Sequence, residues 1–236
     1  RSLARLLKQS QCSHLAPATY ESIDEVQATR PHPEQLWFIK SIMGSAKDKT
    51  LCVPTPVLLA ASLPTDRVVQ AGVTDLQLIG GHKFTFRCYL VVMNRLLYTF
   101  RSGVVFIHGA PYFPNVADYK SQVDNKSYRD ADSEIVLIPL LDTEHSEALL
   151  AGTASLAETL RPALSDVFSE CQDNKFTILG VDTLLKRDGS LTMIRVHSFP
   201  NFVMTRNINN AVHVPLFESI LRTMVGRSSE LLTPVN

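Results

Sequence analysis

Three polar residues near the C-terminal end of the chain have the types and spacing of a metal or anion site. Asp182 lies in one alternating apolar run, and Arg195 and His197 lie in the next, after the polar segment 187–189. Two such runs around a short polar sequence that contains glycine are typical of a β-hairpin. A carboxylate can bind Mg²⁺, but a guanidinium beside it repels the ion and attracts the carboxylate or a phosphate instead. We therefore expect an Asp182–Arg195 ion pair that fills the metal position, or else an Arg195 that points to solvent.

Further cations lie on predicted strands earlier in the chain. Lys83 and Arg87 share one face of an apolar run with Thr85, while apolar residues fill the other face. Charged groups on a buried strand need anionic partners, which are either acidic side chains of the fold or a bound ligand. Lys40 ends a shorter strand and leads into a loop that contains Gly44. Such a lysine can act as a point charge on a phosphate, although the same segment could be a surface hairpin loop.

The composition is that of an ordinary globular protein. The 236 residues are 45% hydrophobic and 19% charged, with a formal net charge of zero, so charge gives no argument for binding nucleic acid or an anionic membrane. The four scattered cysteines favour reduced thiols, and hence a cytoplasmic or other intracellular location. The chain begins with arginine, so we expect a fragment or a processed product. Its basic start, 1–8, is either a surface helix or the remainder of an organelle-targeting segment.

The pattern of elements predicts an α+β fold. Strands are predicted at 36–40, 67–73, 83–92, 96–101, 176–185 and 191–197. The last four of these are expected to share one antiparallel sheet. A helical stripe over 145–171, broken at Pro162, should pack on that sheet. A closing helix over 214–225 has Pro215 in its first turn and Gly226 after its end.

Several of these motifs resemble the tubulin-tyrosine-ligase-like family, which has the ATP-grasp fold. The similarity is clearest at 81–91, Gly-His-Lys-Phe-Thr-Phe-Arg-Cys-Tyr-Leu-Val, and it continues at 98–104 and 176–200. The resemblance implies an ATP-grasp-like antiparallel sheet with packed helices, in which the N-terminal domain of the family is reduced or missing. It divides the chain into an extension or linker (1–35), a reduced central subdomain (36–80) and a C-terminal subdomain (81–236).

The resemblance also implies a role for each candidate residue. The expected catalytic residues are Lys83, Arg87 and Arg101, and the expected nucleotide-binding residues are Lys40, Gln70, Val73 and Asp182. Asp182 matches a metal-binding aspartate, whereas Arg195 and His197 stand where the family has a glutamate and an asparagine as the other metal ligands. Asp48 stands where the phosphate loop should have glycines, and Gln122 is the nearest candidate for a further asparagine of the family.

The resemblance leads to two functional hypotheses. Since the cations are kept and the metal ligands are mostly lost, we expect a catalytically impaired domain, a pseudoenzyme that acts as a protein-binding or assembly module. Its partner would be a protein, with tubulin or a multi-protein assembly as candidates, and ATP with Mg²⁺ would bind weakly or not at all. The alternative is an active ATP-dependent carboxylate–amine ligase that adds tyrosine or glutamate to a protein such as tubulin. A third hypothesis is an unrelated α+β scaffold protein.

Overall fold

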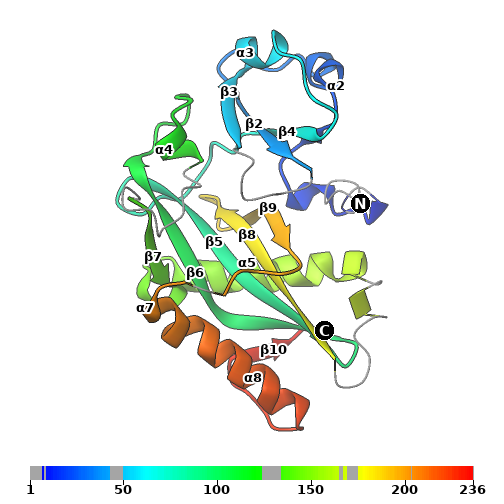
Figure 1. The fold of residues 1–236 in the computed structure, drawn as a ribbon, viewed down its shortest axis with the longest axis vertical. Helices are drawn as coiled ribbons and strands as arrows, with labels where there is room; N and C mark the ends of the chain where they lie inside the picture. The colour runs from blue at the N-terminus through cyan, green and yellow to red at the C-terminus, as the bar shows by residue number, and fades with distance from the viewer. Residues whose placement is uncertain are drawn as a thin grey trace.

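A computed structural model describes residues 7, 9–42, 50–123, 134–164, 167–168, 175–202 and 204–235. The chain forms two antiparallel sheets with several helices, an α+β architecture (Figure 1). The fold class expected from the sequence is therefore confirmed at this level. No helix in the described part of the chain is long and apolar enough to cross a membrane.

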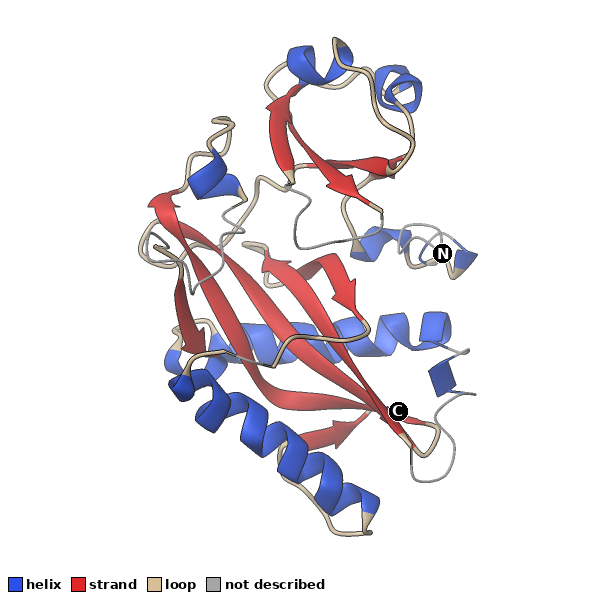
Figure 2. Ribbon diagram, in the orientation of Figure 1, coloured by secondary structure: helices blue, strands red, loops and turns tan. Residues whose placement is uncertain are grey.

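The smaller sheet is built from the first third of the chain. Its strands are β1 (Thr19–Tyr20), β2 (Leu36–Ser41), β3 (Leu51–Pro54) and β4 (Arg67–Ala71), in the order β1-β4-β2-β3. Two short helices, α2 (Ile23–Ala28) and α3 (Thr55–Leu59), lie beside this sheet (Figure 2). Trp37 is the centre of its core, packed with Val26, Leu58 and Val69.

The larger sheet carries the strands that the sequence predicted to pair. Its order is β10-β6-β5-β8-β9, and β7 also pairs with β6. The strands are β5 (His82–Met93), β6 (Leu96–Pro111), β7 (Val136–Pro139), β8 (Phe176–Leu185), β9 (Leu191–His197) and β10 (Leu232–Pro234). All neighbours are antiparallel. The expected shared sheet of 83–92, 96–101, 176–185 and 191–197 is confirmed.

Helices cover both faces of the larger sheet (Figure 1). Phe84, Phe86 and Cys88 face α5 (Ser146–Leu160) in the main core. The α5 helix ends before Pro162, and the chain continues as a 3-10 turn, Arg161–Leu164. This break agrees with the prediction, because proline lacks the amide hydrogen that the helix needs.

The opposite face of β5 is basic in the first half of the strand and apolar in the second half. Its second half presents Tyr89, Val91 and Met93 to a layer made by α7 (Arg206–Ile208), η4 (Asn209–His213) and α8 (Val214–Met224). Its first half presents Lys83 and Arg87 instead. Polar side chains of the smaller sheet, the larger sheet and α4 (Tyr119–Gln122) gather around these two cations.

The segment before residue 36 contributes to both cores where the structure describes it. Leu7, Cys12 and Leu15 are buried in the main core, whereas the strand β1 and the helix α2 belong to the smaller sheet. The described part of 1–35 therefore packs on both units, because its apolar residues find partners in both.

Candidate functional site

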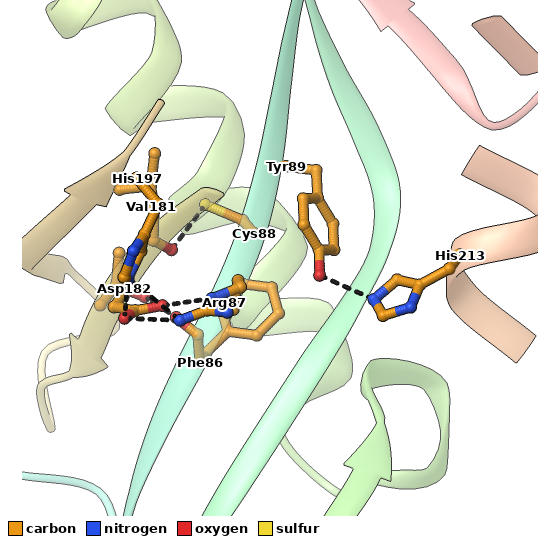
Figure 3. A network of polar contacts seen from close by, with 9 residues as sticks. Phe86, Arg87, Cys88, Tyr89, Val181, Asp182, His197 and His213 are labelled. Carbon is orange, nitrogen blue, oxygen red and sulfur yellow. Dashed lines mark hydrogen bonds and ion pairs between the residues drawn. The ribbon is translucent and has the colours of Figure 1, made fainter. Parts of the chain in front are cut away.

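Asp182 lies at the centre of a buried ionic cluster. Strand pairing sets it opposite Arg87 of β5 on one side and Arg195 of β9 on the other. Arg87 Nε donates to Asp182 Oδ1 at 2.6 Å and Arg87 Nη2 donates to Oδ2 at 3.0 Å, so the ion pair is bidentate. His197 Nε2 lies 2.9 Å from Oδ2, and a protonated Nε2 donates to that oxygen (Figure 3).

The ion pair is shielded from water. The side chains of Arg87 and Asp182 are 11% and 12% exposed, and the guanidinium carbon of Arg87 lies 5.3 Å from the centre of the Phe106 ring. Burial would by itself raise the pKa of Asp182, but Arg87 and His197 more than offset this, and the pKa falls to about 2. Asp182 is therefore a carboxylate anion at any physiological pH.

Of the two arrangements expected for Arg195, the ion pair with Asp182 is wrong and the exposed side chain is confirmed. The carboxylate of Asp182 pairs with Arg87, and Arg195 is exposed to solvent. Cross-strand pairing puts both arginines opposite Asp182, so register alone does not decide between them. Arg87 lies on the central strand, where burial makes a charge partner necessary, whereas Arg195 lies on the outer strand and stays hydrated.

His197 is followed by a turn that packs against the larger sheet. Pro200 packs over Gly180, where an added Cβ would lie only 2.8 Å from the Cβ of the proline. Glycine at 180 therefore leaves room for Pro200, three residues after His197, to pack against β8. His197 is a partner of Asp182 in this fold, as part of a polar network that also keeps Arg87 in place.

Lys83 is a second buried cation, and its contacts are with neutral groups. Its Nζ donates to the main-chain carbonyl of Gln122 at 2.9 Å and lies 3.5 Å from Oε1 of the same residue. It also lies 4.9 Å from the centre of the Phe38 ring, a cation–π contact. Burial lowers the pKa of Lys83 to about 8. Gln122, the candidate for a family asparagine, thus lies beside the cluster and accepts from a cation.

Lys40 connects the smaller sheet to the larger one. Its Nζ donates to Gln70 Oε1 at 2.5 Å and lies 3.4 Å from the carbonyl oxygen of Ile194 in β9. Burial, followed by the charges of Lys83 and Arg195, lowers the pKa of Lys40 to about 7, although Asp182 acts in the opposite direction. Gln70 is oriented by a second bond, since its Nε2 donates to Thr19 Oγ1 at 3.2 Å.

Two other candidates are not brought into this cluster by any described contact. Arg101 is exposed on β6, where its amide nitrogen donates to the carbonyl of Leu231. Val73 lies beyond β4, and its carbonyl accepts a long bond of 3.4 Å from Tyr112. The strand β4 is an inner strand of its sheet, because β1 pairs with it on the side away from β2. Gly44 and Asp48 lie outside the described residues.

The described residues do not fit a Mg²⁺ site. Among them, no three His, Cys, Asp or Glu side chains form a group that could hold a metal ion. The oxygens of Asp182 already accept from a guanidinium and an imidazole, so a second cation there would have to displace Arg87. The site is richer in cations than in anions: Arg87 is matched by Asp182, whereas the bonding partners of Lys40 and Lys83 are neutral.

Some residues of the site were not anticipated from the sequence. The rings of Phe38 and Phe106 lie against Lys83 and Arg87, and alternation within their strands was the only signal that could have placed them. Next to Arg87, Tyr89 Oη lies 2.9 Å from His213 Nε2. His213 Nδ1 is 3.0 Å from both the carbonyl of Phe202 and Asn209 Oδ1, so Nδ1 carries the proton and Nε2 accepts from the tyrosine.

No protein-family model matches the chain, and no curated protein matches its sequence.

Proposed function

We propose that this chain is a catalytically impaired, tubulin-tyrosine-ligase-like domain that binds an acidic segment of a partner protein and does not ligate it. The observation that carries the proposal is the closed Arg87–Asp182–His197 network. Asp182, the carboxylate that the resemblance assigns to Mg²⁺, is neutralised by an internal cation. Ligation through an acyl phosphate depends on a metal to offset the charge of the transferred phosphoryl group, and this network competes with the metal for its ligand.

The surplus of positive charge favours an acidic partner. Lys40 and Lys83 approach one Phe38 ring, at 6.0 and 4.9 Å from its centre, and the charge of Lys83 disfavours the charged form of Lys40. Arg195 adds an exposed charge that also acts on Lys40. Carboxylates of a bound peptide would relieve this repulsion. The resemblance makes tubulin the first candidate among protein partners.

The test is binding of a fluorescent glutamate-rich peptide and of tubulin, measured by anisotropy at low ionic strength. Lys40→Met should weaken binding at least tenfold, because a hydrogen bond to a charged group contributes about 1.5–3 kcal/mol. Lys83→Met should weaken it less, because Lys83 is buried, its Nζ is bonded to Gln122, and it acts on the peptide through its charge alone. Lys120→Met is the matched control, because it removes the same charge from an exposed pair with Glu134. Equal losses in all three variants, or no binding by the unaltered protein, would refute a specific acidic-peptide site.

The second candidate is the active ligase. It is favoured by the retention of the basic residues Lys40, Lys83 and Arg87 on facing elements, an arrangement that could also hold nucleotide phosphates. Titration of ATP with and without Mg²⁺ separates the two proposals. Binding in the low micromolar range that depends on Mg²⁺, together with transfer of labelled tyrosine or glutamate to tubulin, would replace the pseudoenzyme proposal with the ligase.

A further inference from the structure

The outward face of α8 carries an apolar stripe. Its inner face buries Leu216 and Ile220 in the core that it shares with β5 and β6, and a surface helix usually has polar residues on the opposite face. On α8 the opposite face exposes Val214, Leu221 and, at the C-terminal cap, Val225. These side chains are 49%, 60% and 72% exposed, and the helix lies at the periphery of the molecule (Figure 1). The stripe is therefore accessible to another molecule.

The stripe has the spacing of a helix–helix contact. Positions 214, 218, 221 and 225 follow one another at intervals of four, three and four residues, as in the seam of a coiled coil. Glu218 is the charged member of this set, and Arg222 lies one turn beyond it on the same side of the helix. Both side chains are exposed, and neither has an ion-pair partner among the residues that the structure describes. The stripe thus has one acidic and one basic group along the same edge.

We propose that α8 is a self-association surface, on which the α8 helix of a second copy of this chain packs antiparallel about a two-fold axis. Such a contact is isologous: where a residue i of the first copy faces residue j of the second, residue j of the first also faces residue i of the second. The axis runs perpendicular to both helices, so it keeps the same edge of each helix together. The edge with Glu218 and Arg222 therefore meets the same edge of the second copy.

The charges favour this arrangement. With the axis at position 220, Glu218 of each copy lies level with Arg222 of the other, since each is about 3 Å from the axis along the helix. Val214 then lies within one residue of the level of Val225 of the second copy, and the two Leu221 side chains lie beside the axis. A parallel pair would put Glu218 against Glu218 and Arg222 against Arg222, and like charges in such positions repel. Because the helix supplies both members of the ion pair, a second copy is complementary to it.

The contact is small, so the dimer should be weak. We expect one pair of helices of this length to bury less than the roughly 1,200 Å² at the lower limit of a standard interface. The dissociation constant should therefore be in the micromolar range or higher. This inference goes beyond the proposed function and does not rest on it, although a dimer would carry two copies of the basic cluster around Asp182.

The first test is sedimentation equilibrium of the whole chain over a concentration series that reaches about 1 mM, so that weak complexes are detected. We expect the apparent mass to rise from that of the monomer toward that of the dimer. Leu221→Glu puts a further acid beside the axis, where it faces its own copy, and should leave a monomer. Leu141→Glu is the matched control, because Leu141 in η2 (Leu140–Asp142) has a similar exposed fraction of 62%. The control should associate like the unaltered protein.

The second test exchanges the two charges. Glu218→Arg puts an arginine against Arg222 at both symmetry-related positions, and Arg222→Glu puts two acids together there. Each single variant should therefore associate about tenfold more weakly, because two exposed pairs turn from attraction to repulsion. The double variant restores both pairs in reversed order and should associate like the unaltered protein. An equimolar mixture of the two single variants should form a heterodimer, because one supplies both bases and the other both acids. Circular dichroism checks that each variant is folded.

Three results would overturn the proposal. A chain that stays monomeric up to about 1 mM would leave the stripe to a different kind of partner. A dimer that survives Leu221→Glu would use another surface. Association of both single charge variants that equals that of the unaltered protein, with no gain on mixing, would exclude the antiparallel pairing of Glu218 with Arg222.

Discussion

Replacing Arg87 by methionine is the most direct test of the ionic cluster. Methionine has a similar length and suits an apolar environment, so the change removes the guanidinium with little loss of volume. It leaves Asp182 buried, with His197 as its remaining described partner. The two bonds that are lost, at 2.6 and 3.0 Å, are the bonds between the carboxylate and the guanidinium.

The expected loss follows from the burial of the pair. Breaking a buried ion pair by removing one partner costs about 3–5 kcal/mol, because the other charge is left without compensation. We expect about 3 kcal/mol for Arg87→Met, at the lower end, since His197 continues to donate to Asp182 Oδ2. For a chain of this size, each kcal/mol lowers the melting temperature by roughly 2–4 °C, so the expected decrease is roughly 6–12 °C.

The assay is urea unfolding followed by circular dichroism, with two comparison proteins. Arg87→Met combined with Asp182→Asn removes both charges and should recover at least half of the lost stability. Arg195→Ala should change the free energy of unfolding by less than about 0.5 kcal/mol, because Arg195 is exposed. The reasoning fails if Arg195→Ala is the more destabilising single change, or if the double variant is less stable than Arg87→Met alone.

Two further effects follow from the same region. The pKa of Asp182 is lowered to about 2, so its ion pairs stabilise the fold fully above the unfolded pKa of 3.8 and lose this effect as the pH falls toward 2. Urea midpoints measured from pH 5 to 2 should therefore fall less steeply in the Arg87→Met, Asp182→Asn double variant than in the unaltered protein. Gly103→Ala would bring a methyl group against the carbonyl oxygen of Arg87 and to 2.5 Å from the Phe86 ring. This overpacking should cost about 1–3 kcal/mol of stability. A urea midpoint equal to that of the unaltered protein would show that β5 and β6 can separate without cost.

The sheet could be predicted because its signal is local. Alternation along 83–92 and the turn at 187–189 specify strands that can pair in few ways, and Leu149, Leu156 and Leu160 mark the helix face that covers them. The addition of β1 to the smaller sheet could not be predicted in this way. Thr19 and Tyr20 form only two pairs, with Gln70 and Val69, and a two-residue strand leaves no periodicity to detect.

The ionic cluster shows where sequence reasoning stops. Alternation puts Arg87, Asp182 and Arg195 on one face of the sheet, but it does not say which arginine reaches the carboxylate. That choice follows from burial, because Arg87 lies on the inner strand β5 against the Phe106 ring, whereas Arg195 lies exposed on the outer strand β9. The position of each strand in the sheet is a tertiary feature, which residue types do not encode.

The two lysines link binding of an anion to uptake of protons. Burial, together with the charges of Lys83 and Arg195, holds the pKa of Lys40 at about 7, and burial holds the pKa of Lys83 at about 8, both below the usual 10.5. A bound carboxylate favours the charged form of each amine and raises both pKa values. At pH 8.5 the free site is therefore largely deprotonated and the bound site is protonated, whereas at pH 6 both lysines carry protons in either state.

Titration calorimetry of the acidic peptide in buffers of different ionisation enthalpy measures this uptake. We expect binding to take up protons at pH 8.5 and almost none at pH 6, and Lys83→Met should reduce the uptake at pH 8.5. Binding whose heat is independent of the buffer at both pH values would mean that the peptide contacts other cations, such as Arg195, whose charge does not change in this range. The peptide would then bind at the exposed rim of the site, and the lowered pKa values of the two lysines would need another explanation.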